Sequence, residues 1–374
     1  MKIHSFETFY LRIPLKKKYS LSRVIGSKSE TDIVIVKIHT DTDIVGYGEA
    51  DPHVPFTEES AESVCSAIAR YLAPVLIGRD PLDIDDINSS MDKAMKLNLM
   101  AKGSIDMACH DIVGKYFEKP IHRIFEGMDR HKIPLIWAVG NSLPAETVED
   151  VDKAYQHGFG TIMIKTGLFD TAIDLERLEM IRKLFPDLKL IVDVNQGWDV
   201  DTAIMMGRKL EKLDIQFIEQ PVPYWDIKGL SRIRNNISIP LSVDESLLTV
   251  HDAKMIISEK ADDIFSVKVS KNGGLTKTKE LVSLAGENGL KCWMNSMLEE
   301  GVTQAASLNL GLVTPNLLDI GHAYFSPLRL VEDITTYSDL IKETCVYSPQ
   351  NPGLGIEVKE ESFIPYMKEH SIFP

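Results

Sequence analysis

Short apolar runs alternate with longer amphipathic segments through the second half of the chain. The runs are rich in β-branched residues, which indicates strands buried on both faces. Strands are predicted to end near residues 140, 165, 193, 219, 244, 268, 294 and 319, and helices are predicted at 145–156, 170–185, 199–213, 226–236, 251–260 and 274–289. A strand-and-helix unit of about 25 residues, repeated in this way, predicts a (β/α) barrel of the α/β class.

The first 125 residues follow a different pattern. Alternating residues predict a three-stranded antiparallel meander, and helical periodicity follows it. Asp80 and Pro81 supply an N-cap and a first-turn proline to the second of these helices. The strands are predicted at 1–13, 31–39 and 44–49, and the helices at 58–76, 81–95 and 101–116.

Three acidic residues stand at the ends of successive barrel strands. Asp193, Glu219 and Asp244 are about 25 residues apart, which is one barrel unit. Neighbouring strands lie about 4.8 Å apart, so the three carboxylates converge. Such a set suits Mg²⁺, with Mn²⁺ as a substitute, and Asn195 points to the same side of its strand as Asp193. A single strand-end aspartate is more often a turn or cap residue, so the metal prediction rests on the recurrence.

Two lysines flank these acids. Lys165 ends the strand before Asp193, and Lys268 ends the strand after Asp244. The order along the barrel is therefore base, three acids, base, with the two ammonium groups on opposite sides of the metal site. One strand-end lysine alone is usually a solvated charge or an ion-pair partner.

Composition limits the classes of partner. The formal net charge of the 374-residue chain is −14, which argues against nucleic acid and an anionic membrane surface as partners. The four cysteines have no metal-ligand spacing and are expected to be reduced. No apolar run approaches transmembrane length and no signal-peptide pattern is present, so we expect a soluble cytoplasmic protein.

Six short motifs lie in order at the predicted strand ends. They are Ile164-Lys-Thr-Gly167, Asp193-Val-Asn-Gln-Gly-Trp198, Ile218-Glu-Gln-Pro-Val222, Val243-Asp-Glu-Ser246, Val267-Lys-Val-Ser-Lys-Asn-Gly-Gly274 and Met297-Leu-Glu299. Together they resemble the enolase superfamily, in its muconate-lactonizing subgroup (the mandelate racemase and muconate lactonizing enzyme family). That subgroup also includes dipeptide epimerases, N-acylamino-acid racemases and o-succinylbenzoate synthases.

The resemblance implies a domain organisation. Residues 1–125 would form an α+β capping domain, 130–330 the catalytic barrel, and 331–374 a segment that returns to the cap. Two loops, 19–28 and 50–56, would close over the barrel mouth and contribute to specificity. In these loops Arg23 would meet a distal substrate carboxylate and Phe56 or Tyr19 would supply an apolar wall, with exposed loops of no ligand role as the alternative.

Four further residues are candidates for substrate binding. Asn195 and Glu299 would line the pocket from the third and seventh strands. Trp137 would project into the barrel mouth, although a buried tryptophan is more often part of the core. Asp319 would meet a cationic nitrogen, with a solvated loop acid as the alternative.

Two positions depart from the resembled pattern. The second strand usually reads Lys-x-Lys, and here Met163 replaces the first lysine. Dipeptide epimerases of this type carry Asp-x-Asp on the eighth strand, where this chain has Asp319-Ile-Gly321. Half of the clamp for a substrate ammonium group is therefore absent, which favours an amino-acid derivative or another small carboxylate over a dipeptide.

The constellation predicts a reaction class. Mg²⁺ would stabilise the enediolate formed when the proton α to a carboxylate is removed, and a lysine base with Mg²⁺ is the arrangement known for enolase-type sites. Lys165 and Lys268, on opposite faces, would give a racemase or epimerase of an amino-acid derivative. One active lysine would give a cycloisomerase, dehydratase or other lyase, and a catalytically silent barrel is the third alternative. The partners expected are a small carboxylate and further copies of the chain, as in a homo-oligomer.

Overall fold

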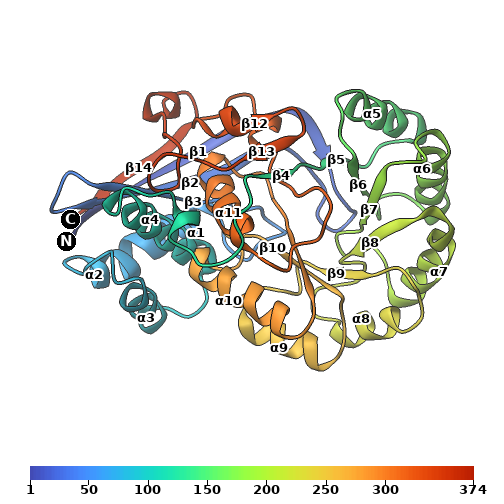
Figure 1. The fold of residues 1–374 in the computed structure, drawn as a ribbon, viewed down its shortest axis with the longest axis horizontal. Coiled ribbons are helices and arrows are strands. Elements are labelled where there is room, and N and C mark those ends of the chain that lie inside the picture. The colour runs from blue at the N-terminus through green and yellow to red at the C-terminus, as the bar shows by residue number, and fades with distance from the viewer.

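The computed structural model describes residues 1–374. An antiparallel sheet and a helical layer, both mostly from the N-terminal part, lie beside a barrel of parallel strands ringed by helices (Figure 1). This is the predicted α/β barrel with an N-terminal α+β cap. No helix is both long and apolar enough to cross a membrane.

The antiparallel sheet has four strands, one more than the predicted meander. Its order is β14-β1-β2-β3, so the C-terminal strand pairs with the N-terminal one and the two chain ends lie together (Figure 1). The strands are β1 (Ile3–Ser20), β2 (Ser27–Thr40), β3 (Val45–Ala50) and β14 (Met367–Phe373).

The helical layer covers one face of this sheet. It consists of α1 (Ala61–Ala67), a π-helical turn (Ile68–Leu72), α2 (Ala73–Leu76), α3 (Ile84–Ala94) and α4 (Leu99–Tyr116). The single helix predicted at 58–76 is divided by the π turn, which precedes Pro74, a residue with no N–H to donate. The predicted cap at Asp80 is wrong: Asp83 caps α3 by accepting the N–H of Asp86 at 3.0 Å.

The barrel sheet has seven parallel strands in sequence order. The strands are β5 (Trp137–Val139), β6 (Thr161–Lys165), β7 (Lys189–Asp193), β8 (Ile215–Glu219), β9 (Leu241–Val243), β10 (Ile264–Val267) and β11 (Lys291–Met294). Isolated bridges from Leu317 to Cys292 and from His322 to Leu135 connect its two edges through residues 317–322. The expected first strand at 133–140 is divided, because β4 (Lys132–Pro134) pairs instead in a small sheet with β13 (Cys345–Tyr347) and β12 (Ile341–Lys342).

Seven helices follow the strands around the outside. They are α5 (Pro144–Gln156), α6 (Thr171–Leu184), α7 (Val200–Leu210), α8 (Ile227–Arg234), α9 (Val250–Ser258), α10 (Gly274–Glu287) and α11 (Gly301–Val313). The pattern predicted the first six within a few residues. Helix α11 was not predicted, and every one of its residues is buried.

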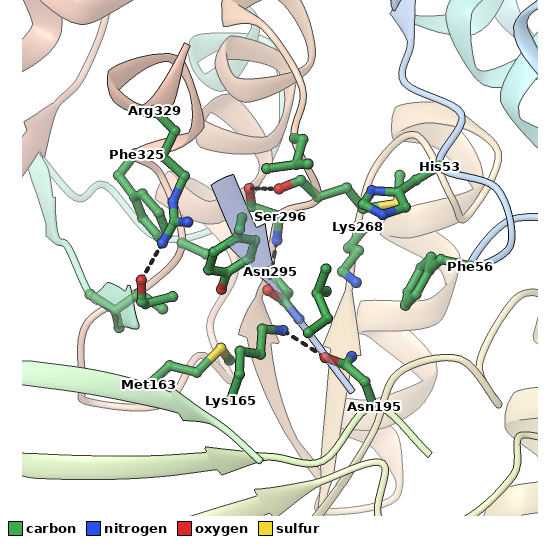
Figure 2. A pocket seen from close by; sticks show the side chains of 17 residues that line it. His53, Phe56, Met163, Lys165, Asn195, Lys268, Asn295, Ser296, Phe325 and Arg329 are labelled. Atoms are coloured by element: carbon green, nitrogen blue, oxygen red, sulfur yellow. Dashed lines mark hydrogen bonds between the residues drawn. The ribbon is translucent and has the colours of Figure 1, made fainter. Parts of the chain in front are cut away.

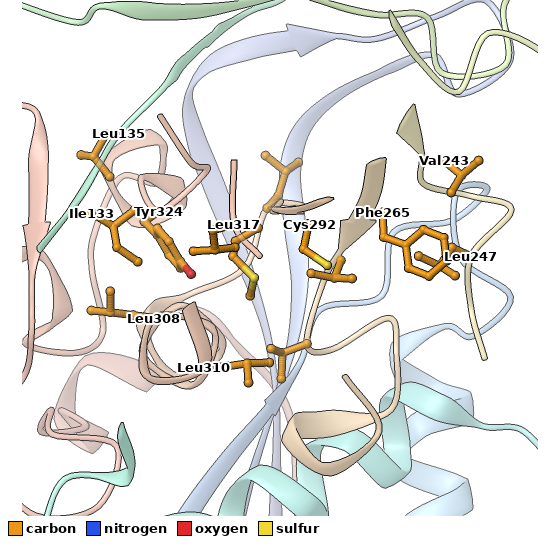
Figure 3. Close-up of a cluster of buried hydrophobic side chains, with 14 of the residues drawn as sticks. Ile133, Leu135, Val243, Leu247, Phe265, Cys292, Leu308, Leu310, Leu317 and Tyr324 are labelled. Atoms are coloured by element: carbon orange, nitrogen blue, oxygen red, sulfur yellow. The ribbon is translucent and has the colours of Figure 1, made fainter. Parts of the chain in front are cut away.

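Most of the buried apolar side chains form one core between the barrel strands and the surrounding helices. Figure 3 shows part of it, where Leu308 and Leu310 of α11 lie near Cys292, Leu317 and Tyr324. A smaller cluster fills the barrel interior, and Met163, Phe217 and Trp293 belong to it. The packed interior leaves the carboxyl ends of the strands as the place for a site.

Candidate active site

Five strands bring acidic and basic side chains to one end of the barrel. Lys165, Asp193 and Glu219 are the last residues of β6, β7 and β8. Strand register places Lys165 beside Asp193, and Asp193 beside Glu219. Asp244 and Lys268 follow β9 and β10 directly. None of the five is more than 8% exposed, so their charges interact in a poorly solvated space.

Each lysine is paired with a different carboxylate. Lys165 Nζ donates to Asp193 Oδ2 and, at 3.0 Å, to Asn195 Oδ1. Lys268 Nζ donates to Asp244 Oδ2 at 2.5 Å. Burial alone would lower the pKa of both lysines, but the neighbouring carboxylates outweigh it, so the pKa of each is raised. The two bases therefore carry protons in this arrangement.

Asp244 is the most strongly paired acid of the group. Besides Lys268 it accepts a hydrogen bond on Oδ1 from Lys271 Nζ at 2.9 Å. Burial opposes ionisation, but the two ammonium groups lower the pKa of Asp244 to about 2. Lys271 follows Lys268 by three residues in a motif noted above, although sequence reasoning gave it no role.

Glu219 is the least satisfied acid. Its Oε1 accepts from Asn295 Nδ2 at 2.8 Å, whereas its Oε2 is buried with no hydrogen-bond partner. Burial, together with the negative charges of Asp193 and Asp244, raises the pKa of Glu219 well above its usual range. A buried carboxylate oxygen without a partner destabilises the fold, so a positive group bound next to Glu219 Oε2 would be favourable.

The donor set fits a divalent cation, although no three such side chains already meet at one point. The ammonium groups of Lys165 and Lys268 occupy oxygens of Asp193 and Asp244 that a cation would need. The unpartnered Glu219 Oε2 lies between these two acids in strand order. Three carboxylates of this kind provide the oxygen ligands that Mg²⁺ prefers, once the ammonium groups move aside.

A small cavity of about 40 Å³ lies above the cluster. Figure 2 shows the ends of Lys165 and Lys268 pointing into it from its two sides. Its walls contain no aspartate or glutamate. They are formed by Tyr19, Leu21, His53, Phe56, Ile136, Ala138, Met163, Lys165, Asn195, Lys268, Asn295, Ser296, Met297, Leu298, Ala323, Phe325 and Arg329.

The loop at 50–56 contributes two rings to this cavity. Lys268 Nζ lies 4.3 Å from the centre of the Phe56 ring, a cation–π contact that holds the ammonium group in place. His53 has a buried Nε2 without a partner, and burial, with the charges of nearby lysines, lowers the pKa of His53 to about 3. The prediction for Phe56 placed it at the site, whereas His53 was not singled out.

Glu299 lies beneath the cavity wall and is absent from its lining. Its Oε2 accepts from the N–H of Met297 at 2.6 Å and from Ser296 Oγ at 3.1 Å, and its Oε1 accepts from Gln304 Nε2 at 2.5 Å. The carboxylate therefore fixes the loop whose side chains line the cavity.

Besides Glu299, three predicted binding residues are absent from the cavity lining: Arg23, Asp319 and Trp137. Arg23 is exposed and donates to the carbonyl of Gly167 at 3.1 Å, outside the cavity. Asp319 is exposed at the opposite end of the barrel, where its carbonyl accepts from Lys189, the first residue of β7. The eighth strand runs on past Asp319, so the residues it brings to the mouth are Ala323 and Phe325.

Trp137 is turned away from the cavity by strand alternation. Its neighbours Ile136 and Ala138 line the cavity, so Trp137 faces the other side of the strand. There it contacts Phe325 and Phe159, with ring centres 5.3 and 5.5 Å away. Tyr19, predicted as a candidate apolar wall, does line the cavity, and so does Arg329, which carried no motif and was not predicted.

Family models match both parts of the chain. The model described as enolase C-terminal domain-like matches residues 146–362, and that of the mandelate racemase and muconate lactonizing enzyme N-terminal domain matches residues 7–125. The N-succinyl-L-Arg/Lys racemase of Bacillus cereus is 32% identical over 97% of this chain and 97% of its own. Chloromuconate cycloisomerase of Cupriavidus pinatubonensis is 30% identical over 93% of this chain and 94% of its own.

Solved structures agree over the whole chain. The crystal structure of the Bacillus cereus racemase has a TM-score of 0.95, with 30% identity and all of both chains covered. A dipeptide epimerase from Cytophaga hutchinsonii, in complex with Mg and the dipeptide D-Ala-L-Val, has a TM-score of 0.93 with 27% identity and the same full coverage.

Proposed function

Because this chain belongs to the mandelate racemase and muconate lactonizing enzyme family of the enolase superfamily, we propose that it racemises or epimerises an N-acylated amino acid. Its family relatives are racemases, epimerases and cycloisomerases, and the chain is likewise an isomerase whose chemistry is Mg-dependent removal of the proton α to a carboxylate. The observation that carries the finer proposal is the pair of lysines, Lys165 and Lys268, which reach one cavity from opposite sides.

The charge of the cavity supports an N-acyl substrate. No carboxylate lines the walls, so a free α-ammonium group would find no counter-charge there. An acyl group removes that positive charge and adds apolar surface, which suits walls made largely of apolar residues such as Phe56 and Leu298. The Bacillus cereus relative acts on an N-succinylated amino acid, in line with this class.

Asp193, Glu219 and Asp244 would hold Mg²⁺. When bound, the cation supplies positive charge that stabilises the negative charge on the substrate carboxylate as the α-proton leaves, and it neutralises the acids that raise the pKa of both lysines. Asn195 and Asn295, which contact Lys165 and Glu219, would keep these groups oriented.

The two lysines would then share the proton transfer. An unprotonated Lys165 Nζ would take the proton from one face of the α-carbon, and a protonated Lys268 Nζ would deliver one from the other face, which inverts the centre. The opposite enantiomer uses the same groups in reversed roles. The ring of Phe56 over Lys268 would exclude water from that side.

The test is α-proton exchange in D₂O with Mg²⁺, over N-acylated amino acids, dipeptides, proline derivatives and muconates. We expect deuterium at the α-carbon together with inversion for an N-acyl amino acid. In Lys165→Ala or Lys268→Ala we expect racemisation to fall at least ~10³-fold, while the remaining lysine still exchanges the proton of one enantiomer. Full racemisation by both variants would falsify the two-base mechanism.

A second candidate is cycloisomerisation of a muconate-type dicarboxylate. The similarity to chloromuconate cycloisomerase favours it, as does a cavity without acids, which would accept a dianion. In that reaction only one lysine moves a proton. A product of new connectivity, with no inversion of any N-acyl amino acid, would select it over the racemase.

A further inference from the structure

Arg329 lies where two hollows of the molecule meet. It ends the short 3₁₀ helix Ser326–Arg329, which follows the last barrel segment. Its side chain lines the active-site cavity and also a larger open groove of about 750 Å³ beside it. Tyr19 and Ala138 also line both, so these three residues form the boundary between the two spaces.

The guanidinium is held flat in an aromatic box. Its central carbon lies 4.0 Å from the Tyr19 ring centre, 5.0 Å from that of Phe325 and 5.2 Å from that of Trp137. One Nη2 proton goes to the carbonyl of Ala138 (Figure 2). These contacts fix the orientation of the guanidinium group and leave several of its N–H donors without a hydrogen bond to the protein.

No carboxylate of the protein forms an ion pair with Arg329. Lys165 and Lys268, the other cations of the cavity, each have an aspartate partner. The carboxylate whose charge acts on Arg329 is that of Asp150, which is engaged by Lys17 at 2.6 Å. Arg329 is therefore the one cation facing the cavity whose charge the protein leaves unbalanced.

Arg177 shows what a purely structural arginine looks like in this fold. It is fully buried and pairs with Asp174 at 3.0 Å, and it donates to Asn141 and to the carbonyl of Lys165. The Nε, Nη1 and Nη2 atoms of its guanidinium group all donate hydrogen bonds within the protein. Arg329 has the fixed geometry of such a residue without the acid, an arrangement suited to a planar anion from outside.

We propose that Arg329 is a specificity-determining residue that binds a second acidic group at the distal end of the substrate. The substrate class is then a dianion, such as an N-acyl amino acid whose acyl chain ends in a carboxylate. One carboxylate lies at the lysine and acid cluster, and the other forms a paired hydrogen bond with the guanidinium. This inference rests on the proposed function, because it takes that cluster as the place of the reacting carboxylate.

The test compares two ligands that differ only at the distal end. N-succinylglycine carries a carboxylate where N-butyrylglycine carries a methyl group. Their binding is measured by calorimetry with Mg²⁺ present, which does not require turnover. We expect the full-length protein to prefer N-succinylglycine by about 10- to 100-fold, the value of one charge-assisted hydrogen-bonded pair.

Variants assign the preference to the residue. Arg329→Met should abolish the preference while N-butyrylglycine binds as before, and Arg329→Lys should keep part of it. The matched control is Lys16→Met, which removes a cation that lines only the groove and should leave the preference unchanged.

Three outcomes would overturn the proposal: equal binding of both ligands by the unaltered protein, binding of neither, or a preference that survives in Arg329→Met. A parallel loss of both ligands in that variant would also contradict it, since it would mean that Arg329 only supports the cavity wall. The α-proton exchange described above is read separately. A protein that racemises N-acyl amino acids without regard to their distal charge keeps the proposed function and loses this inference.

Discussion

Gln220 is a buried residue that ties together the loops carrying the proposed metal ligands. Its backbone φ is 35°, a region that residues other than glycine seldom adopt. Its Oε1 accepts the N–H groups of Asp244 at 3.0 Å and Ser246 at 3.2 Å. Its Nε2 donates to the carbonyl of Val222 at 3.0 Å and to Ser246 Oγ at 2.8 Å. The side-chain amide thus fixes the backbone that presents Asp244.

Gln220→Ala should weaken Mg²⁺ binding without touching a ligand. The change leaves two buried N–H groups unpaired, at about 1–3 kcal/mol each, and frees the Asp244 backbone. We expect the apparent Mg²⁺ affinity, measured by calorimetric titration, to fall at least ~10-fold. Gln196→Ala is the control, because Gln196 also has a positive φ, but its side chain donates to Glu245 and accepts from the N–H of Tyr224 and makes no hydrogen bond to the backbone of Asp244. Equal losses in both variants would contradict a specific role for Gln220.

The charged residues at the ends of the barrel strands were the positions that the sequence predicted most closely. An apolar run followed by a charged side chain marks the end of a buried strand, and Lys165, Asp193 and Glu219 are each the last residue of a strand. Asp319 failed because the eighth strand is held by isolated bridges and continues beyond its apolar run. Arg329 carried no periodic signal at all, since its place depends on side chains from distant parts of the chain.

At the scale of elements, β3 and α4 approach unusually closely. A Cβ on Gly48 would lie 1.7 Å from the carbonyl oxygen of Ser104, and one on Gly46 would lie 2.1 Å from that of Ala108. Both oxygens belong to the backbone of α4, so no side chain can move aside. The two glycines therefore set the spacing between the N-terminal sheet and its covering helix.

Gly48→Ala should destabilise the protein by about 2 kcal/mol or more, because α4 must shift away from the sheet. Urea unfolding at constant pH measures the change. The control is Gly160→Ala, since a Cβ there meets nothing within 4 Å and the backbone φ is not positive. That variant should be neutral or slightly stabilising, through the lower entropy of the unfolded chain. A Gly48→Ala protein as stable as the control would show that the helix can shift at no cost.

The helices that the sequence predicted are those with one polar, exposed face. The barrel helices α5 to α10 have exposed faces, so their apolar residues show a helical period. Helix α11 is buried along its whole length, so polar residues such as Gln304 and Asn309 mark no exposed face in its sequence, and it was not predicted. Its N-terminus is fixed instead by Glu49 of β3, which accepts the N–H groups of Glu300 at 2.6 Å and Thr303 at 2.8 Å.

At the scale of the whole molecule, the order of strands around the barrel followed from the repeat alone. The pairing of the chain's two ends did not, because β14 is a short strand whose partner, β1, lies more than 350 residues away in the sequence. Periodicity describes a segment and its exposed face, whereas the choice of partner for an edge strand depends on the assembled fold.

Several acids outside the cluster of lysines and carboxylates are buried deeply enough to make stability depend on pH. Burial raises the pKa of Glu49 to about 8, that of Glu59 to about 7 and that of Asp262 to about 7. In the unfolded chain each titrates near its ordinary value. The folded state therefore binds more protons than the unfolded state between those two pKa values, so the free energy of unfolding decreases as pH rises through that window.

Asp262→Asn isolates one of these groups. Asp262 is 2% exposed, and one of its carboxylate oxygens has no hydrogen-bond partner. Burial, with the charge of Asp263, raises the pKa of Asp262 from an ordinary 3.8 to about 7. Its favourable contribution is fully present below pH 3.8 and is lost by about pH 7. Between pH 5 and pH 9 the unaltered protein should lose about 2 to 3 kcal/mol more unfolding free energy than Asp262→Asn, at about 1.4 kcal/mol per pKa unit. Urea unfolding of both proteins at the two pH values measures this difference, and parallel losses would mean that Asp262 ionises in the folded state as easily as in water.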